Sequence, residues 1–235
     1  MSDPSYAALW GFGFLLGLRH ALDADHLAAV STVLAERPSL RASSAVGLWW
    51  GIGHTVTLLA VGAIVLAWGI RIPEGFELIA ESGVGLLLVA LGGSLAFRLY
   101  RDRWHVHSHS HDDGPHVHLH NHRWEADHRH QHWMAGLIRP LCIGMAHGLA
   151  GSAALMLVVL SVTRELTAGL LSITVFGVGS IVGMMAIGLT ISLPLVCSFS
   201  INHRLFVGLQ GLAGAASVCV GLWMLARLAL AAAGH

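Results

Sequence analysis

Residues 17–30 read G-L-R-H-A-L-D-A-D-H-L-A-A-V, a strongly apolar stretch that contains two histidines and two aspartates. Ionisable side chains at membrane depth are costly and are normally kept for a substrate path or a charged partner. Imidazole and carboxylate together also make up a ligand set that suits divalent transition metals. The stretch therefore predicts a membrane protein that handles a metal ion.

The composition of the 235 residues agrees with a membrane location, because 55% are hydrophobic and only 11% are charged. A soluble domain carries about 25% charged residues. The formal net charge is zero and the sequence contains no lysine, so no basic field for nucleic-acid binding is indicated. The apolar run from Tyr6 continues into the motif instead of a cleavage site, so we expect a retained membrane span.

Six stretches contain the roughly 20 mainly apolar residues that a transmembrane helix needs. We therefore predict an all-α integral membrane protein with six transmembrane helices, multi-pass in the inner (plasma) membrane of the cell. The three cysteines form no C-x-x-C pair, so we expect buried core residues and neither a disulfide framework nor a zinc knuckle. The predicted spans cover about 6–33, 44–69, 76–98, 135–162, 166–197 and 204–231.

A hydrophilic, histidine-rich segment at 99–134 separates the third predicted span from the fourth. It holds 11 of the 17 histidines, many of them at alternating positions. This biased composition is typical of a metal-binding tract and not of a folded domain. The candidate ligands here, expected to bind more weakly than those in the membrane, are His105, His107, His109, His111, His116, His118, His120, His122, His128, His130 and His132.

The sequences on the two sides of this loop resemble each other at an offset of 126 to 128 residues. Three spans are an odd number, so a second copy must enter the membrane in the opposite sense, as in transporters with inverted repeats. We predict a 3+3 inverted repeat, with repeats at 1–98 and 135–235 and the loop at 99–134. Matching by glycine-rich composition alone is the competing explanation. The matched positions are G-L-R-H-A-L at 17–22 with G-M-A-H-G-L at 144–149, G-I-G-H at 51–54 with G-V-G-S at 177–180, Gly83 with Gly211, and Gly93 with Gly221.

The arginines outside the spans are distributed unevenly between the two sides of the membrane. Most of them fall in loops on the side opposite the N-terminus. The positive-inside rule then predicts that the histidine-rich loop is cytoplasmic and that both termini lie outside.

The candidate intramembrane site draws on three predicted spans. Successive steps of three residues form one oblique stripe on a helix, and His20, Asp23 and His26 follow that spacing. Asp25 lies about 140° from His20 on a regular helix, so both can face one ion only if the helix is distorted there. Small residues flank a histidine in the second and fourth spans and allow close helix approach. A lone buried histidine is more often a hydrogen-bonded core residue, but here we expect several metal ligands to converge. These ligands are His20, Asp23, Asp25, His26, His54 and His147.

The sequence R-H-A-L-D-A-D-H-L at 19–27 resembles the signature of the nickel/cobalt transporter family, a histidine followed by four residues and then Asp-His. G-I-G-H-T-V-T at 51–57 resembles the second motif of the family. The resemblance covers the first three spans and implies a secondary permease for Ni²⁺ or Co²⁺, with no enzymatic activity and no prosthetic group. It also implies that His20, Asp25, His26 and His54 are important for uptake.

The chain departs from typical members of that family, which have eight spans and an acidic Asp-Thr motif in the second half. It is similar to the six-span permeases linked to urease or hydrogenase maturation, whereas its histidine-rich loop resembles the nickel/cobalt efflux branch. We favour uptake and keep efflux as the first alternative, followed by a zinc transporter. A membrane serine hydrolase using Ser152 and a non-transporting metal sensor are the other classes considered. A soluble metallochaperone and an oligomeric state stay open at this level.

Overall fold

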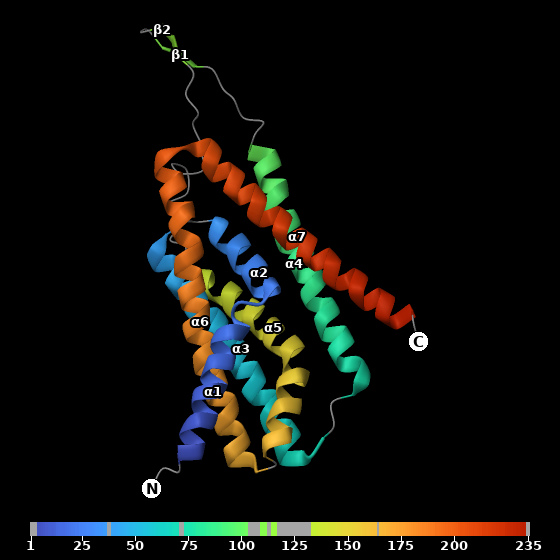
Figure 1. Cartoon of the computed structure of the whole chain (residues 1–235). Coiled ribbons are helices and arrows are strands. Elements are labelled where there is room, and N and C mark those ends of the chain that lie inside the picture. Colours follow the sequence, from blue (N-terminus) through green and yellow to red (C-terminus); the bar gives the residue numbers. More distant parts are fainter. Residues whose placement is uncertain are drawn as a thin grey trace.

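A computed structural model of the chain describes residues 4–36, 39–70, 73–102, 109–111, 114–116, 133–163 and 165–233. Within these residues the fold consists of α-helices and one short antiparallel hairpin (Figure 1). The helices are α1 (Pro4–His20), α2 (Ala24–Ala35), α3 (Leu40–Trp68), α4 (Glu74–Asp102), α5 (Trp133–Val162), α6 (Leu166–Ile201) and α7 (His203–Ala233), and the strands are β1 (His109–His111) and β2 (Gly114–His116).

The first predicted span, 6–33, is not one helix. It divides into α1 and α2, because the helix breaks at Ala21–Asp23. Tight turns close this break, where the Leu22 amide donates to the Arg19 carbonyl and the Asp23 amide donates to the His20 carbonyl. The helix is thus interrupted within the stretch whose ligand spacing required a distortion.

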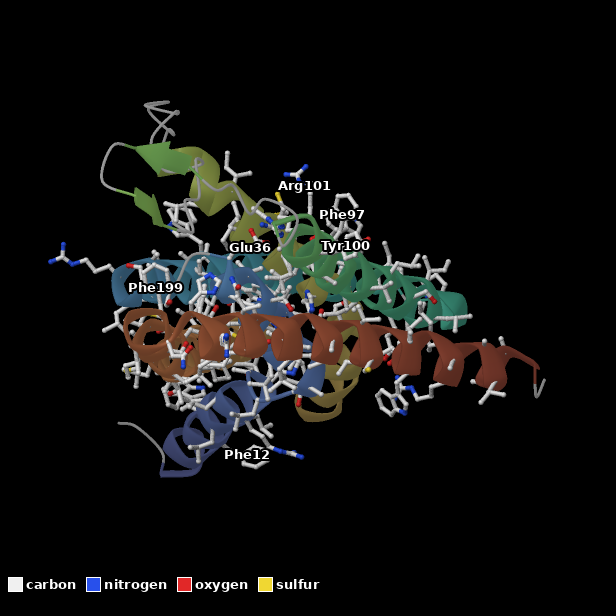
Figure 2. All side chains as sticks on the ribbon, turned by 90° about the horizontal axis from the view of Figure 1, so that it is seen from above. Phe12, Glu36, Phe97, Tyr100, Arg101 and Phe199 are labelled. Atoms are coloured by element: carbon white, nitrogen blue, oxygen red, sulfur yellow. The ribbon has the colours of Figure 1, made fainter. Side chains whose placement is uncertain are left out.

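Long apolar helices make up most of the described chain. Four of them are long and apolar enough to cross a membrane, namely Leu40–Trp68, Gly75–Arg101, Leu166–Phe199 and His203–Ala232. Large apolar side chains such as Phe12 and Phe97 are exposed and lie on the outside of the ribbon (Figure 2). An apolar exterior of this kind suits hydrocarbon and not water, so the fold is that of a multi-pass membrane protein.

The helices of the first half pack against helices of the second half. The main contacts join α3 to α6, α3 to α5, α1 to α6 and α4 to α7. In Figure 1, α1, α3, α5 and α6 form one bundle, while α4 and α7 run beside each other along one side of it. The short helix α2 packs against α7, α4 and α6 and thus connects the two groups.

Two glycines let helices of the bundle approach until backbone meets backbone. A Cβ at Gly17 would collide with the carbonyl oxygen of Phe176, and a Cβ at Gly144 would collide with that of Trp50. A larger residue would push the helices apart, because a carbonyl group cannot rotate away from the added carbon. Small residues at such contacts are the usual means of close packing in membranes.

Polar side chains fasten α2 to its neighbours. The Thr32 hydroxyl lies 2.8 Å from the Ala28 carbonyl of its own helix and 3.2 Å from the Ala213 carbonyl of α7, and the Gln210 amide donates to the Ala35 carbonyl at 2.6 Å. Beyond the last turn of α2, the two carboxylate oxygens of Glu36 accept from Arg98 of α4 and Arg139 of α5. The far end of α2 is therefore held to three other helices.

Two sequence predictions about the surroundings of the bundle have different outcomes. The prediction of buried cysteines is wrong, because Cys142, Cys197 and Cys219 are all exposed on the outside of the protein. A thiol behaves as a small apolar group, and an apolar solvent gives no reason to bury it.

In the loop at 99–134, backbone is described for the hairpin, which pairs His109 with His116. The side chains of the eleven loop histidines lie outside the described residues, so their metal binding stays a prediction.

Candidate metal site

The break in the first span positions four of the predicted ligands. His20 is the last residue of α1, Asp23 lies in the break, and Asp25 and His26 belong to the first turn of α2. The break brings the ring of His26, which contacts Asp25, to 4.8 Å from the ring of His20. Local unwinding of this kind is common where membrane transporters bind their substrates.

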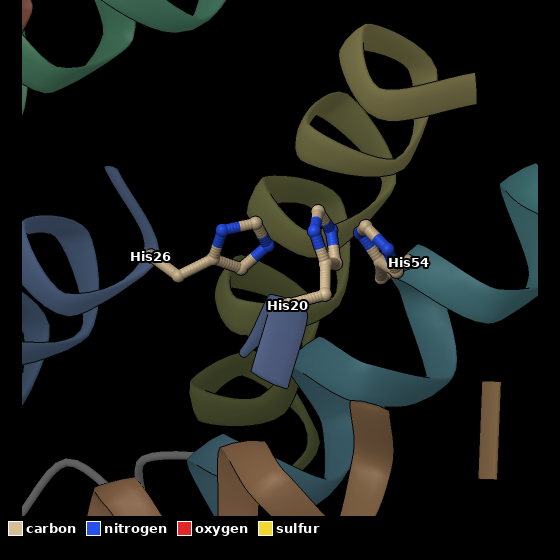
Figure 3. Close-up of side chains that lie close together, drawn as sticks. All are labelled: His20, His26 and His54. Atoms are coloured by element: carbon tan, nitrogen blue, oxygen red, sulfur yellow. The ribbon is translucent and has the colours of Figure 1, made fainter. Parts of the chain in front are cut away.

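Three histidines from three helices face one another (Figure 3). The ring centre of His20 lies 4.8 Å from that of His26 and 5.0 Å from that of His54, and the His26 and His54 rings are 5.5 Å apart. One nitrogen from each ring lies within 4.8 Å of the others. His26 and His54 are buried, and His20 is partly exposed. We call His20, His26 and His54 the imidazole triad.

The separation of these nitrogens is close to what a shared cation requires. Two imidazole nitrogens, each about 2.1 Å from one divalent ion, are at most about 4.2 Å apart. The observed limit of 4.8 Å exceeds that value by a fraction of an ångström. Small rotations of the rings are therefore enough to bring the imidazole triad into coordination distance.

Both aspartates of the motif lie against histidines. An oxygen of Asp23 lies 2.8 Å from Nδ1 of His20, and an oxygen of Asp25 lies 3.1 Å from Nδ1 of His26. Asp23 is 54% exposed, whereas Asp25 is 24% exposed and faces a second ring as well. The two carboxylates therefore occupy different environments although they are two residues apart.

His147 of α5 completes the group from the other half of the chain. Its ring centre lies 5.0 Å from that of His26, and its Nε2 lies 3.9 Å from the second oxygen of Asp25. Its Nδ1 lies 3.0 Å from the carbonyl oxygen of Ile143, which can only accept a hydrogen bond. Nδ1 therefore carries the proton, and in the neutral ring Nε2 presents a lone pair toward Asp25.

Unsatisfied polar atoms gather around these rings. In the described part of the chain, six buried side-chain nitrogen and oxygen atoms have no hydrogen-bond partner, and five of them belong to His26, Trp50, His54 and His147. Leaving a buried polar atom without a partner costs about 1–3 kcal/mol. Such groups in a native structure call for an explanation, and a bound ion is one of the recognised ones. A divalent cation among the imidazoles would accept lone pairs from the histidine nitrogens, whereas Trp50 Nε1–H is a donor and is not satisfied by a cation.

Trp50 is a residue of the site that the sequence analysis did not identify. It is fully buried, and its ring centre lies 5.0 Å from that of His147 and 6.4 Å from that of His26. Its spacing from His54 could have indicated its place in the site. Residues four apart share one face of a helix, and Trp50 precedes His54 by four. Its bulk forms one wall of the site.

Apolar helices around buried imidazole and carboxylate groups define a multi-pass membrane protein with an interior suited to a divalent cation. The NicO family model, described as "High-affinity nickel-transport protein", matches residues 7–232. The chain therefore belongs to the NicO family. This result confirms the resemblance to the nickel/cobalt transporter family that the motifs at 19–27 and 51–57 indicated. It also agrees with the expectation that the chain is no enzyme, because the family is one of nickel transport.

Two curated relatives extend the comparison. A protein of Bacillus sp. (strain TB-90) named "Urease accessory protein UreH" is 37% identical over 199 residues, which cover 84% of this chain and 82% of that protein. A protein of Cupriavidus necator named "High-affinity nickel transport protein" is 34% identical over 87 residues, which cover 36% of this chain and 24% of that protein. No solved structure matches the chain.

Proposed function

We propose that this chain is a secondary transporter that takes up Ni²⁺, with Co²⁺ as a second substrate, across the plasma membrane. The proposed metal ligands are the imidazole triad, Asp25 and His147, and Asp23 lies against His20 at the edge of this site. The observation that carries the proposal is the meeting of four imidazoles from four helices, whose buried nitrogens include several with no hydrogen-bond partner. The family and the name of the Cupriavidus necator relative support nickel as the substrate.

The donor set suits transport better than permanent storage. Neutral imidazole and carboxylate bind Ni²⁺ and Co²⁺ well, whereas thiolates favour softer metals such as Cu(I). The three cysteines all lie on the exposed outer surface and thus away from the buried rings. The two partly exposed members, His20 and Asp25, offer the ion contact with both the surface and the buried nitrogens. An ion can then exchange its hydration shell for protein ligands in steps.

The packing of the helices supports the 3+3 inverted repeat as part of this proposal. Helices at corresponding places in the two halves run in opposite directions, as Figure 1 shows for α3 and α6 and for α4 and α7. The contact of Gly17 with Phe176 has a counterpart in the contact of Gly144 with Trp50, and the paired positions differ by 127 and 126 residues. If the two halves of the chain exchanged places, each of these two contacts would therefore fall at the position of the other. In this arrangement His20 and His147 are equivalent positions near the centre.

The same proposal places the histidine-rich loop in the cytoplasm and both termini outside. A cytoplasmic loop rich in imidazole would bind metal that has just entered and limit its return. A soluble metallochaperone would be the natural recipient. Residues 1–98 and 135–235 then form the two repeats, and the loop at 99–134 stays outside the transport path.

The proposal is tested by measuring cellular metal with mass spectrometry after exposure to Ni²⁺, Co²⁺ or Zn²⁺ at trace concentrations. Cells that express the wild-type chain should accumulate more nickel than control cells. His20→Ala should abolish the gain while the protein still reaches the membrane, which immunoblots of membrane fractions verify. His203→Ala is the matched control, because His203 is exposed at the start of α7 and lies outside the site.

Three results would contradict the proposal. If His20→Ala accumulated nickel like the wild type, the ion would not travel through the imidazole triad. If expression lowered cellular nickel and raised nickel tolerance, the chain would export the metal. If expression raised cellular zinc alone, the substrate would be Zn²⁺ and not Ni²⁺ or Co²⁺.

A further inference from the structure

We propose that Asp23 is a positioning residue for His20 and does not itself bind the transported ion, an inference that rests on the proposed function. Asp23 lies outside the histidine–four residues–Asp-His pattern that His20, Asp25 and His26 fill. Nothing in that pattern gives Asp23 a role, and its spacing alone would make it one more ligand. The contacts of its carboxylate indicate a different task.

Asp23 occupies the position where α2 begins, yet its side chain does not cap that helix. An aspartate at this position commonly accepts a hydrogen bond from a backbone amide of the first turn. Asp23 has the extended backbone of an N-cap residue, with φ −63° and ψ 145°, but its side chain makes no capping hydrogen bond. The carboxylate instead lies 2.8 Å from Nδ1 of His20. The local preference for capping is given up in favour of a contact with the site.

That contact fixes which nitrogen of His20 can bind a metal. An ionised carboxylate has no proton to donate, so Nδ1 of His20 is the donor and Nε2 of the neutral ring carries the lone pair. His147 follows the same rule, with the Ile143 carbonyl oxygen as its acceptor at 3.0 Å. His26 also follows this rule, because its Nδ1 lies 3.1 Å from an oxygen of Asp25 that accepts its hydrogen bond. Three rings therefore have Nδ1 engaged and Nε2 available.

The unpartnered atoms agree with this pattern. Nε2 of His26 and Nε2 of His147 are both buried without a hydrogen-bond partner in the described chain. Histidines that bind metals commonly donate their second ring N–H to a carboxylate or a backbone carbonyl, which fixes the tautomer and the orientation of the ring. The acceptors here are thus in place for a site built from Nε2 atoms.

The surroundings of Asp25 set it apart from Asp23. One oxygen of Asp25 accepts from His26, and the other lies 3.9 Å from Nε2 of His147, where two lone pairs face each other. Opposed lone pairs at that separation favour a cation between them, so Asp25 can serve both as an acceptor and as a ligand. Asp23 is 54% exposed and lies against His20 on the outer side of the site. The charge of Asp25 is therefore needed at the ion, whereas Asp23 needs only to accept a hydrogen bond.

The two roles are separated by asparagine substitutions. Asp23→Asn keeps an oxygen that accepts the His20 Nδ1–H but removes the charge, whereas Asp23→Ala removes both. Metal binding is measured with Co²⁺ on the purified full chain, labelled with 5-fluorotryptophan, by ¹⁹F NMR. The Trp50 signal is the one missing from Trp50→Phe, and because Trp50 lies beside His147 its paramagnetic broadening follows the intramembrane site instead of the loop. The KM and maximal rate of nickel uptake are measured in parallel.

We expect Asp23→Ala to weaken Co²⁺ binding and raise the KM by about 10- to 100-fold, as is usual when an outer partner of a metal ligand is removed. Asp23→Asn should stay within a few-fold of the wild type. Asp25→Asn should be as damaging as Asp25→Ala. If Asp23→Ala does not yield folded protein, Asp23→Ser replaces it, because serine is a favoured residue at the start of a helix.

The inference is overturned if Asp23→Asn is as weak as Asp23→Ala, since an anionic oxygen would then be required. It is equally overturned if Asp23→Ala binds like the wild type. Failure of the wild-type chain to bind Co²⁺ at Trp50 or to take up nickel would instead contradict the proposed function. The two failures are thus distinguishable.

Discussion

The contact between α4 and α7 gives a sharp test of the fold, because two adjacent glycines have opposite surroundings. A Cβ added at Gly92 would collide with the carbonyl oxygen of Gly214 and would lie 2.8 Å from Cγ2 of Val218. A Cβ added at Gly93 would meet nothing within 4 Å. Gly92→Ala should therefore force the two helices apart, and Gly93→Ala should leave their packing unchanged.

The magnitude follows from comparing the two variants. Replacement of glycine by alanine in a helix gains about 1 kcal/mol at either position, so this gain cancels in the comparison. Overpacking at Gly92 adds a cost of about 1–3 kcal/mol. The ratio of folded to unfolded protein should then differ between the variants by about 5- to 150-fold. Gly214→Ala should fall between them, because its Cβ would lie 3.3 Å from the Gly92 carbonyl oxygen.

The assay is unfolding in mixed micelles, with increasing sodium dodecyl sulfate and with helix content followed by circular dichroism. The expected order of stability is Gly93→Ala, then Gly214→Ala, then Gly92→Ala. Equal midpoints for Gly92→Ala and Gly93→Ala would refute the reasoning, because the helices would then not touch where the structure places them.

Three further predictions concern the site and its supports. His147→Ala should reduce nickel uptake at unchanged membrane abundance, and uptake equal to the wild type would remove α5 from the site. Burial by itself would raise the pKa of Glu36, but its contacts with Arg139 and Arg98 outweigh this effect and lower the pKa below the ordinary value of 4.5. A lowered pKa stabilises the fold above the ordinary value, and the contribution is lost as the pH falls through the folded-state pKa. Glu36→Gln should thus lower the free energy of unfolding, measured in detergent, by about 1–2 kcal/mol at neutral pH and by progressively less on acidification below pH 4.5. A difference between Glu36→Gln and the wild type that does not depend on pH would contradict the ion pairs. Deletion of 105–132 should leave nickel transport in place with an altered concentration dependence, and complete loss would favour a metal sensor or accessory protein with the loop as its working part.

The sequence predicted the helical, membrane-embedded character of the chain because a bilayer permits few alternatives. Every backbone polar group must be satisfied within the helix, so a long apolar run in such a chain indicates a transmembrane helix. The motif spacing also indicated that Asp25 and His20 could face one ion only if the first span were distorted, since they point apart on an intact helix. Which residues form the turn depends on contacts with α6 and α7, and these lie far away in sequence.

Finer features of the packing were beyond sequence reasoning because a helix turns 100° per residue. The sequence comparison emphasised Gly83 and Gly93, which face open space, whereas Gly85 and Gly92 make the contacts with α7. An error of one or two residues moves a side chain to a different face, and a glycine-rich helix offers several equally good matches. Trp50 illustrates the same limit, because tryptophan is enriched at interfaces and a buried one needs a partner that only the fold reveals.

The two central histidines of the proposed repeat are held in different ways, and this difference bears on where the site can change. His147 donates to the carbonyl of its own helix four residues earlier, so its ring orientation is tied to α5. His20 ends α1, and its Nδ1 lies 2.8 Å from the carboxylate of Asp23, which belongs to the break and is half exposed. A carbonyl within a helix moves with that helix, whereas a carboxylate in a turn can follow a rotation of α2 against α1. The α5 side is thus the fixed wall of the site. Any change that opens the site to one side of the membrane or the other is therefore expected at Ala21–Asp23, where a small change in the turn alters the distance from His20 to His26 and Asp25 together.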